Sequence, residues 1–116
     1  MEDNLRSEQL EDLLAEVNAV KVYSTVNLTV LDAAMQQYWE IIKELNSIAP
    51  TIFNNLATNG IIDLQNRANL IKQATTVSAK SSGYKDYWDY LSHSIKITIE
   101  YINNFLPESL AYTDAD

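Results

Sequence analysis

Apolar residues recur along most of this chain at intervals of three and four, which is the spacing of one face of an α-helix. Between residues 31 and 48 the intervals alternate strictly, and the apolar face consists of Leu31, Ala34, Tyr38, Ile41, Leu45 and Ile48. The same register extends towards the N-terminus through Leu10, Leu13, Val17 and Val20. A face repeated over this length is typical of helices that pack side by side in a bundle.

The apolar register is interrupted at Ser24 and Asn27. Both lie within residues 20–30, where β-branched residues, which are poor helix formers, cluster and alternate with polar ones. We therefore predict a break or kink near residues 24–27, since a short strand there would lack a partner strand. The pattern leaves open whether residues 7–48 form one kinked helix or two.

Proline and glycine mark the middle of the chain. Pro50 ends the helix before it, because the residue that precedes a proline is driven out of the helical conformation. Pro50 can also open a short helix, for which Asn59-Gly60 is the predicted C-terminal stop. A weaker helix is then expected over residues 61–78.

The two outer helices have their own boundary signals. Ser7, which acidic residues follow, is the predicted N-cap of the first helix. Ser81-Ser82-Gly83 is a predicted hinge. After it, the last helix is expected to run from about Tyr84 to Leu106, where Pro107 prevents its continuation.

These elements predict an all-α fold, a small bundle of four to five helices with antiparallel long helices and a short connector helix after Pro50. The chain has 116 residues, which is enough for one domain with its own core. We expect the bundle to span residues 7–106, between an acidic N-terminal arm, residues 1–6, and an acidic C-terminal tail, residues 107–116. Two glycines and two prolines are too few to punctuate an all-β fold.

The formal net charge of -8 is concentrated at the two ends of the sequence, and residues 17–106 carry as many basic as acidic residues. Binding to nucleic acid or to an anionic membrane needs a basic face, so we expect neither partner. The first residues lack the basic and then apolar pattern of a secretory signal, and no apolar run is long enough to span a membrane. We therefore expect a cytoplasmic protein.

The residues offer little catalytic or metal-binding chemistry. The chain has no cysteine, which excludes thiolate nucleophiles and thiolate metal sites. His93, the one histidine, falls by helical projection on a polar stripe with Asp86 and Asp89, as an ordinary surface residue does. No phosphate-binding glycine loop and no carboxylate–histidine spacing of di-iron bundles occurs. We expect a protein that is not an enzyme and holds no cofactor or metal; an enzyme of a kind that these motifs do not reveal is a lesser hypothesis.

The last helix carries a second apolar stripe beside its main one, here called the tyrosine flank, formed by Tyr87, Tyr90, Ser94, Ile97 and Tyr101. Each apolar stripe needs a neighbouring helix or a partner protein to cover it. One hypothesis is that this helix is central and its own bundle covers both stripes. The other is that the tyrosine flank contacts a partner or a second copy, because tyrosine is enriched at interfaces.

In the second long helix, Met35 lies beside the main face and Trp39 further round, a position typical of a bundle edge or an interface anchor.

Two functional interpretations follow from these surfaces. The first is a non-catalytic protein–protein interaction module, such as an adaptor, assembly factor or chaperone-like subunit, that binds a protein partner or a second copy through the aromatic residues Tyr87, Tyr90, Ile97, Tyr101, Trp39 and Met35. The second is an acidic inhibitor or immunity protein that blocks a basic site of a partner such as a nuclease. Its contact would consist of Glu8, Glu11, Asp12 and Glu16.

A third alternative rests on the C-terminal sequence Tyr112-Thr113-Asp114-Ala115-Asp116. Tyr112 and Asp116 match the Tyr-x-x-x-Asp/Glu tail of the small helical-hairpin proteins exported by type VII secretion, which this acidic, cysteine-free, helical chain somewhat resembles. The resemblance implies a secreted hairpin protein. The family's Trp-x-Gly turn is absent, because Trp39 is followed by Glu40 and Ile41.

Overall fold

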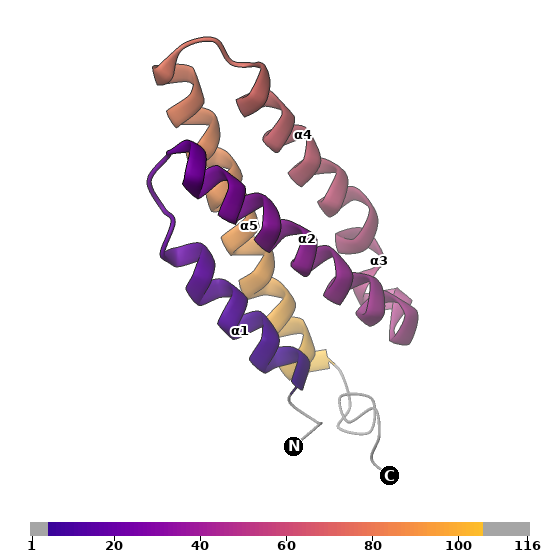
Figure 1. The fold of residues 1–116 in the computed structure, drawn as a ribbon. Helices are drawn as coiled ribbons and strands as arrows, with labels where there is room; N and C mark the ends of the chain where they lie inside the picture. Colours follow the sequence, from indigo (N-terminus) through magenta and orange to yellow (C-terminus); the bar gives the residue numbers. More distant parts are fainter. Residues whose placement is uncertain (1–4, 106–116) are drawn as a thin grey trace.

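A computed structural model of the protein describes residues 5–105, and these residues form a small all-α bundle, which confirms the predicted fold class (Figure 1). The helices are α1 (Leu5–Asn18), α2 (Thr25–Ile48), α3 (Pro50–Asn55), α4 (Ile61–Gln73) and α5 (Val77–Phe105), with a π-helical segment, η2 (Leu56–Gly60), between α3 and α4. Helix α1 runs antiparallel to α2, and α4 runs antiparallel to α5 (Figure 1). The first turn of α1 and the last turn of α5 therefore lie at the same end of the bundle (Figure 1).

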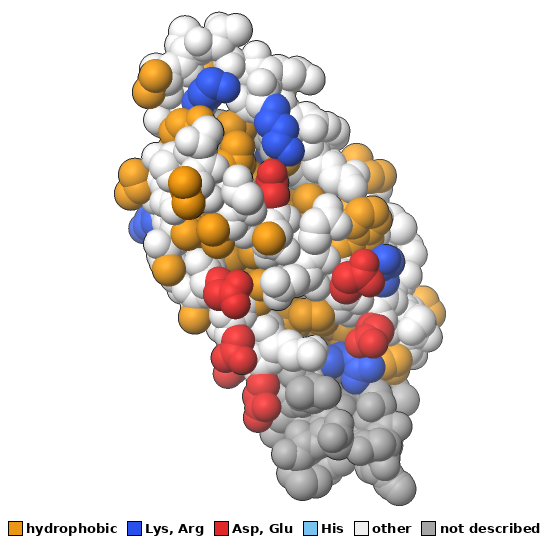
Figure 2. Space-filling model, in the orientation of Figure 1, with side chains coloured by type: hydrophobic (Ala, Val, Ile, Leu, Met, Phe, Trp, Pro, Cys, Tyr) orange, Lys and Arg blue, Asp and Glu red, His pale blue; other side chains and the backbone are white. Residues whose placement is uncertain are grey.

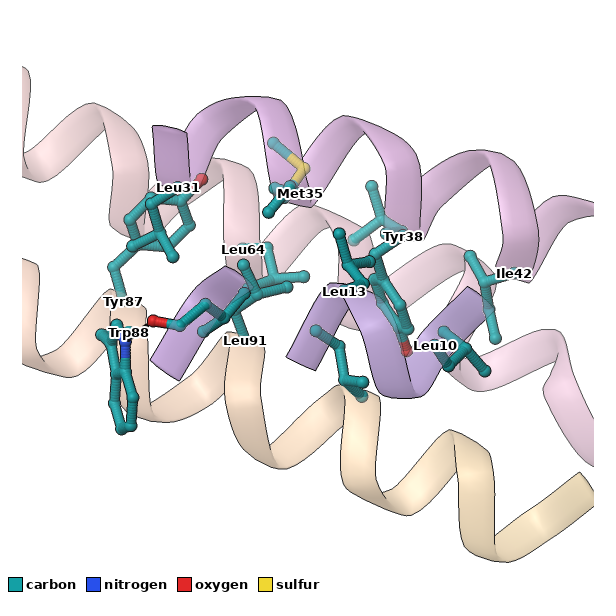
Figure 3. Close-up of a cluster of buried hydrophobic side chains, with 14 of the residues drawn as sticks. Leu10, Leu13, Leu31, Met35, Tyr38, Ile42, Leu64, Tyr87, Trp88 and Leu91 are labelled. Carbon is teal, nitrogen blue, oxygen red and sulfur yellow. Dashed lines mark hydrogen bonds between the residues drawn. The ribbon is translucent and has the colours of Figure 1, made fainter. Parts of the chain in front are cut away.

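The longest helix, α5, packs against α4, α1 and α2 and closes the core of the bundle. One face of α5 is buried along nearly its whole length, whereas Phe105 near its end is exposed. The buried residues of this face are Tyr84, Trp88, Leu91, Ile95, Thr98 and Ile102. The apolar faces of the other helices meet it in one cluster (Figure 3). The fully buried large side chains of this cluster are Tyr38, Tyr84, Tyr87, Phe53, Leu10, Leu13, Leu31, Ile42, Leu45, Leu64, Ile71 and Leu91.

The predicted break in the first apolar register is confirmed, and it separates two helices rather than kinking one. Residues 19–24 connect α1 to α2. Ser24 is extended and caps α2, because its side chain accepts a hydrogen bond from the backbone N–H of Asn27 at 2.9 Å. The Asn27 side chain in turn donates to the Val22 carbonyl at 2.8 Å. The two polar residues that interrupt the register therefore make the turn.

Two predicted boundaries are wrong. Asn59-Gly60 does not end a helix, because α3, η2 and α4 follow one another without a gap and Gly60 keeps a right-handed φ of -61°. The hinge at residues 81–83 lies inside α5, and the turn falls earlier, at residues 74–76, where Thr76 accepts a hydrogen bond from the Ala79 N–H at 3.0 Å. Gly83 allows close packing instead, since a Cβ there would lie 3.1 Å from Cγ1 of Ile71 in α4.

The N-terminal boundary also differs from the prediction. Leu5 and Arg6, which the sequence assigned to an acidic arm, belong to α1. Ser7 therefore lies inside the helix and is not its N-cap; it is buried, and its hydroxyl has no hydrogen-bond partner in the part of the chain that the structure describes. The rest of the arm and the predicted acidic tail, residues 107–116, lie outside the described residues.

The two glycines predict opposite responses to alanine. At Gly60 an added Cβ meets nothing closer than 3.7 Å, so Gly60→Ala should raise the free energy of unfolding by about 0.5–1 kcal/mol, the usual gain of alanine over glycine in a helix. At Gly83 an added Cβ would crowd Ile71, which offsets that gain. Gly83→Ala should therefore raise the free energy of unfolding by less than Gly60→Ala does, or should lower it. Urea unfolding followed by circular dichroism measures both. A larger gain at position 83 than at position 60 would contradict this packing.

Candidate functional site

Two aromatic residues of α5 attach the α1–α2 connection to the core. The indole N–H of Trp88 donates to the Val17 carbonyl at 2.7 Å, and the Tyr84 hydroxyl donates to the Val20 carbonyl. Val17 lies in the last turn of α1 and Val20 just beyond its end, where carbonyls lack the usual helical donor four residues on. The Val17 carbonyl also accepts the Val20 backbone N–H at 3.1 Å, and the two aromatic side chains add donors to this helix end from across the core.

The tyrosine flank is largely covered by the bundle itself. Tyr87 is fully buried, and its hydroxyl donates to Oδ1 of Asp32 in α2 at 2.7 Å. The other carboxylate oxygen of Asp32 lies 3.2 Å from Nζ of Lys72 in α4. Asp32 thus links three helices through one carboxylate. Ser94, also on this flank, is buried as well.

The structure corrects the assignment of Tyr87 and Met35 to a partner-binding surface. Tyr87 is 0% exposed and Met35 is 4% exposed, and both lie in the core cluster (Figure 3). Helix α5 with its two apolar stripes is central here: α2 contacts the second stripe at Tyr87, and α4 contacts it at Tyr90. Neither Tyr87 nor Met35 can contact a partner while the bundle is intact.

The remaining predicted aromatic contacts are half-buried. The Tyr90 hydroxyl donates to Oδ2 of Asp63 at 3.0 Å, and the Arg67 guanidinium lies 4.2 Å from the centre of its ring. Ile97 and Tyr101 are half-buried further along α5, as is Trp39 in α2, over which Nζ of Lys43 lies at 5.1 Å. Tyr90, Ile97 and Tyr101 share the tyrosine flank of α5, whereas Trp39 belongs to another helix, α2.

The structure forms an acidic groove between α1 and α2. A hollow of about 420 Å³ is lined by Gln9, Asp12, Leu13, Glu16, Gln37, Glu40 and Ile41. A neighbouring hollow of about 230 Å³ shares three of these residues and adds Glu44. Leu13 is buried and Ile41 half-buried, so carboxylates from both helices border an apolar floor. Figure 2 shows acidic side chains over α1 and further acidic ones, beside basic ones, over the second half of α2.

Only part of the predicted acidic contact lines this groove. Asp12 and Glu16 line it, and neither has an ion-pair partner within residues 5–105. Glu8 and Glu11 are exposed on α1 outside it. Glu40 and Glu44, which were not predicted for this contact, form ion pairs with Lys43 at 3.2 Å and with Arg6 at 3.3 Å. Their spacing of four residues on α2 was the available indication, but the antiparallel packing on α1 was needed to place them.

A further hollow, of about 590 Å³, gathers several ionisable side chains of α4 and α5. His93 is exposed, as expected, and lines this hollow together with Asp86, Asp89, Arg67 and Lys96. No group of three or more histidine, aspartate or glutamate side chains in the described part could hold a metal ion. Burial raises the pKa of Tyr38, Tyr84, Tyr87 and Tyr90, which makes these hydroxyls weaker acids than usual.

Comparison with known proteins adds no relative to these observations: no protein-family model, curated protein or solved structure matches the chain. Among residues 5–105, no helix is long and apolar enough to cross a membrane.

The burial of Tyr87 predicts the result of removing its hydroxyl. Tyr87→Phe leaves a partly buried carboxylate, Asp32, without one donor and should lower the free energy of unfolding by about 1–3 kcal/mol. Tyr23→Phe is the control, since the half-buried Tyr23 hydroxyl makes no hydrogen bond to the described residues, and it should cost less than about 0.5 kcal/mol. Urea unfolding tests both. Equal losses would show that the Asp32 contact does not stabilise the bundle.

The buried tyrosines predict a loss of stability at alkaline pH. Burial raises the pKa of Tyr84 to about 12 and raises the pKa of Tyr38 and Tyr87 well above the usual range. Tyrosine in the unfolded chain titrates near pH 10, so this stability is complete below about pH 10 and falls above it, by about 1.4 kcal/mol per pH unit for each such tyrosine.

Unfolding by urea at several pH values, with tyrosinate absorbance recorded in parallel, measures this effect. Tyr84→Phe is the control, because it removes one of the groups and should make the decline above about pH 10 shallower. A free energy of unfolding that stays level to about pH 11.5 would contradict the burial of these hydroxyls.

Proposed function

We propose that this protein is a non-catalytic protein-binding module, and that it binds a basic segment of a protein partner in the acidic groove between α1 and α2. The observation that carries the proposal is the convergence of Asp12 and Glu16 from α1 with Glu40 from α2 above an apolar floor. Where such a basic segment belongs to the active site of a partner such as a nuclease, binding blocks that site.

The chemistry of the groove favours lysine and arginine side chains. Asp12 and Glu16 are one helical turn apart and exposed, so their like charges repel one another until a cation lies between them. Leu13 and Ile41 can pack against the alkyl stems of these long side chains while the carboxylates pair with their charged ends. The acidic surface also accelerates association with a basic partner, and salt screens that effect.

A second candidate is the aromatic adaptor, now limited to the C-terminal end of α5. Phe105 is 57% exposed, and its ring packs edge-on against Tyr101 with centroids 5.5 Å apart. An exposed phenylalanine ring held beside a half-buried tyrosine supports a contact with an apolar partner surface. The type VII alternative stays a prediction, because Tyr112 and Asp116 lie outside the described residues.

The groove is tested with two pairs of substitutions that change the net charge equally. The pair Asp12→Asn with Glu16→Gln lies in the groove, and the pair Glu8→Gln with Glu11→Gln lies on α1 outside it. The probe is a short labelled peptide of lysine and leucine, and its binding is measured by fluorescence anisotropy at low and high salt. The groove pair should raise the dissociation constant about tenfold and the control pair less than about twofold.

Two outcomes would contradict the groove proposal. If both pairs weaken binding equally, the peptide recognises the net charge of the protein and not the groove. If the unaltered protein fails to bind the peptide at low salt, the groove is not a site for basic segments. In contrast, a partner that is retained at high salt and lost on Phe105→Ala would favour the aromatic candidate.

A further inference from the structure

We propose that two copies of this chain associate through one face, here called the valine face, formed by the α1–α2 connection and the first turns of α2. This face lies at the end of the bundle opposite the first turn of α1 (Figure 1). It is distinct from the acidic groove, and the inference does not depend on the proposed function.

Exposed valines are the first observation. Val22 is 75% exposed, Val26 is 71% exposed and Val30 is 36% exposed. Val26 and Val30 lie one turn apart on α2, and the bond from Asn27 to the Val22 carbonyl holds the connection beside that first turn. Figure 2 shows hydrophobic side chains gathered over this part of the molecule. Three branched apolar side chains held together on a surface are typical of an interface.

An apolar hollow next to the valines is the second observation. It measures about 340 Å³, and Val22 stands at its edge. Its aromatic lining comes from Tyr23, Tyr84 and Trp88, whose positions are set by hydrogen bonds and ring contacts within the core. When two copies face each other across a two-fold axis, the projecting Val22 of each copy can fit into the hollow of the other. The same face is then used on both copies, so the assembly ends at a dimer.

The distribution of charge favours a second copy as the occupant. The net charge of -8 is concentrated at the two ends of the sequence, so repulsion between two copies is strongest where those ends meet. Residues 19–33 and 68–90, which form this end of the bundle, carry four basic residues, Lys21, Lys72, Lys80 and Lys85, against three acidic ones, Asp32, Asp86 and Asp89. Lys21 and Lys85 border the hollow, where Nζ of Lys85 lies 3.1 Å from Asp89 and Nζ of Lys21 lies 5.2 Å from the centre of the Trp88 ring. The charges around the apolar centre are therefore nearly balanced, and no acidic surplus opposes the approach of a second copy.

The mass of the purified protein, measured by sedimentation over a concentration series, tests this inference. We expect a reversible monomer–dimer equilibrium. Val26→Glu places two carboxylates against each other across the apolar contact and should raise the dimer dissociation constant by about tenfold or more. Ile62→Glu is the matched control, since Ile62 is 52% exposed on α4, and it should leave the equilibrium unchanged. Circular dichroism confirms that both variants fold, and Val26→Ser provides an uncharged second variant.

Cross-linking locates the contact independently. The chain has no cysteine, so Val26→Cys and Ile62→Cys each introduce a single thiol. A short bismaleimide should link Val26→Cys chains into covalent dimers and leave Ile62→Cys chains monomeric. A monomer at about 1 mM chain, a dimer that Val26→Glu leaves intact, or equal cross-linking at both positions would overturn the inference.

Discussion

The bundle depends on aromatic side chains of α5 whose rings are buried and whose polar atoms must still form hydrogen bonds. Each polar atom reaches a different element: Trp88 contacts the end of α1, Tyr84 the α1–α2 connection and Tyr87 Asp32 of α2. A buried hydroxyl or indole N–H without a partner would cost more than the bond contributes, so these contacts select one arrangement of the helices. The rings supply apolar burial, and their hydrogen bonds supply specificity.

This use of α5 decides which surfaces remain for binding. Most of the tyrosine flank packs within the bundle and is not available to a partner. Asp32 is not available either, because it already contacts both Tyr87 and Lys72. The accessible features include a groove bordered by carboxylates between α1 and α2 and an apolar face around Val22 and Val26 at the other end. The two surfaces differ in charge and hydropathy, so their partners would differ in chemistry.

Local sequence patterns located the elements better than their boundaries. The break between α1 and α2 was predictable because Ser24 and Asn27 make their hydrogen bonds within a few residues. The hinge at residues 81–83 was wrong because Gly83 serves the contact with Ile71, which lies on another helix. Gly60 likewise continues a helix with ordinary dihedral angles. A glycine that allows two helices to approach and a glycine that ends one have the same sequence signature.

The sequence by itself determined the all-α class, most of the buried face of each long helix and the absence of thiol chemistry, because helical periodicity and residue content are local properties. In α2 the buried face is shifted, since Met35 and Ile42 are buried and the predicted members Ile41 and Ile48 are half-buried. Only the tertiary structure decided that Tyr87 and Met35 are core residues and that Glu40 faces Asp12 and Glu16 across a groove. An apolar stripe shows that a residue will be covered, but which helix covers it depends on how the helices pack. The groove arises for the same reason, since its two walls are distant in sequence and meet only when α1 packs against α2.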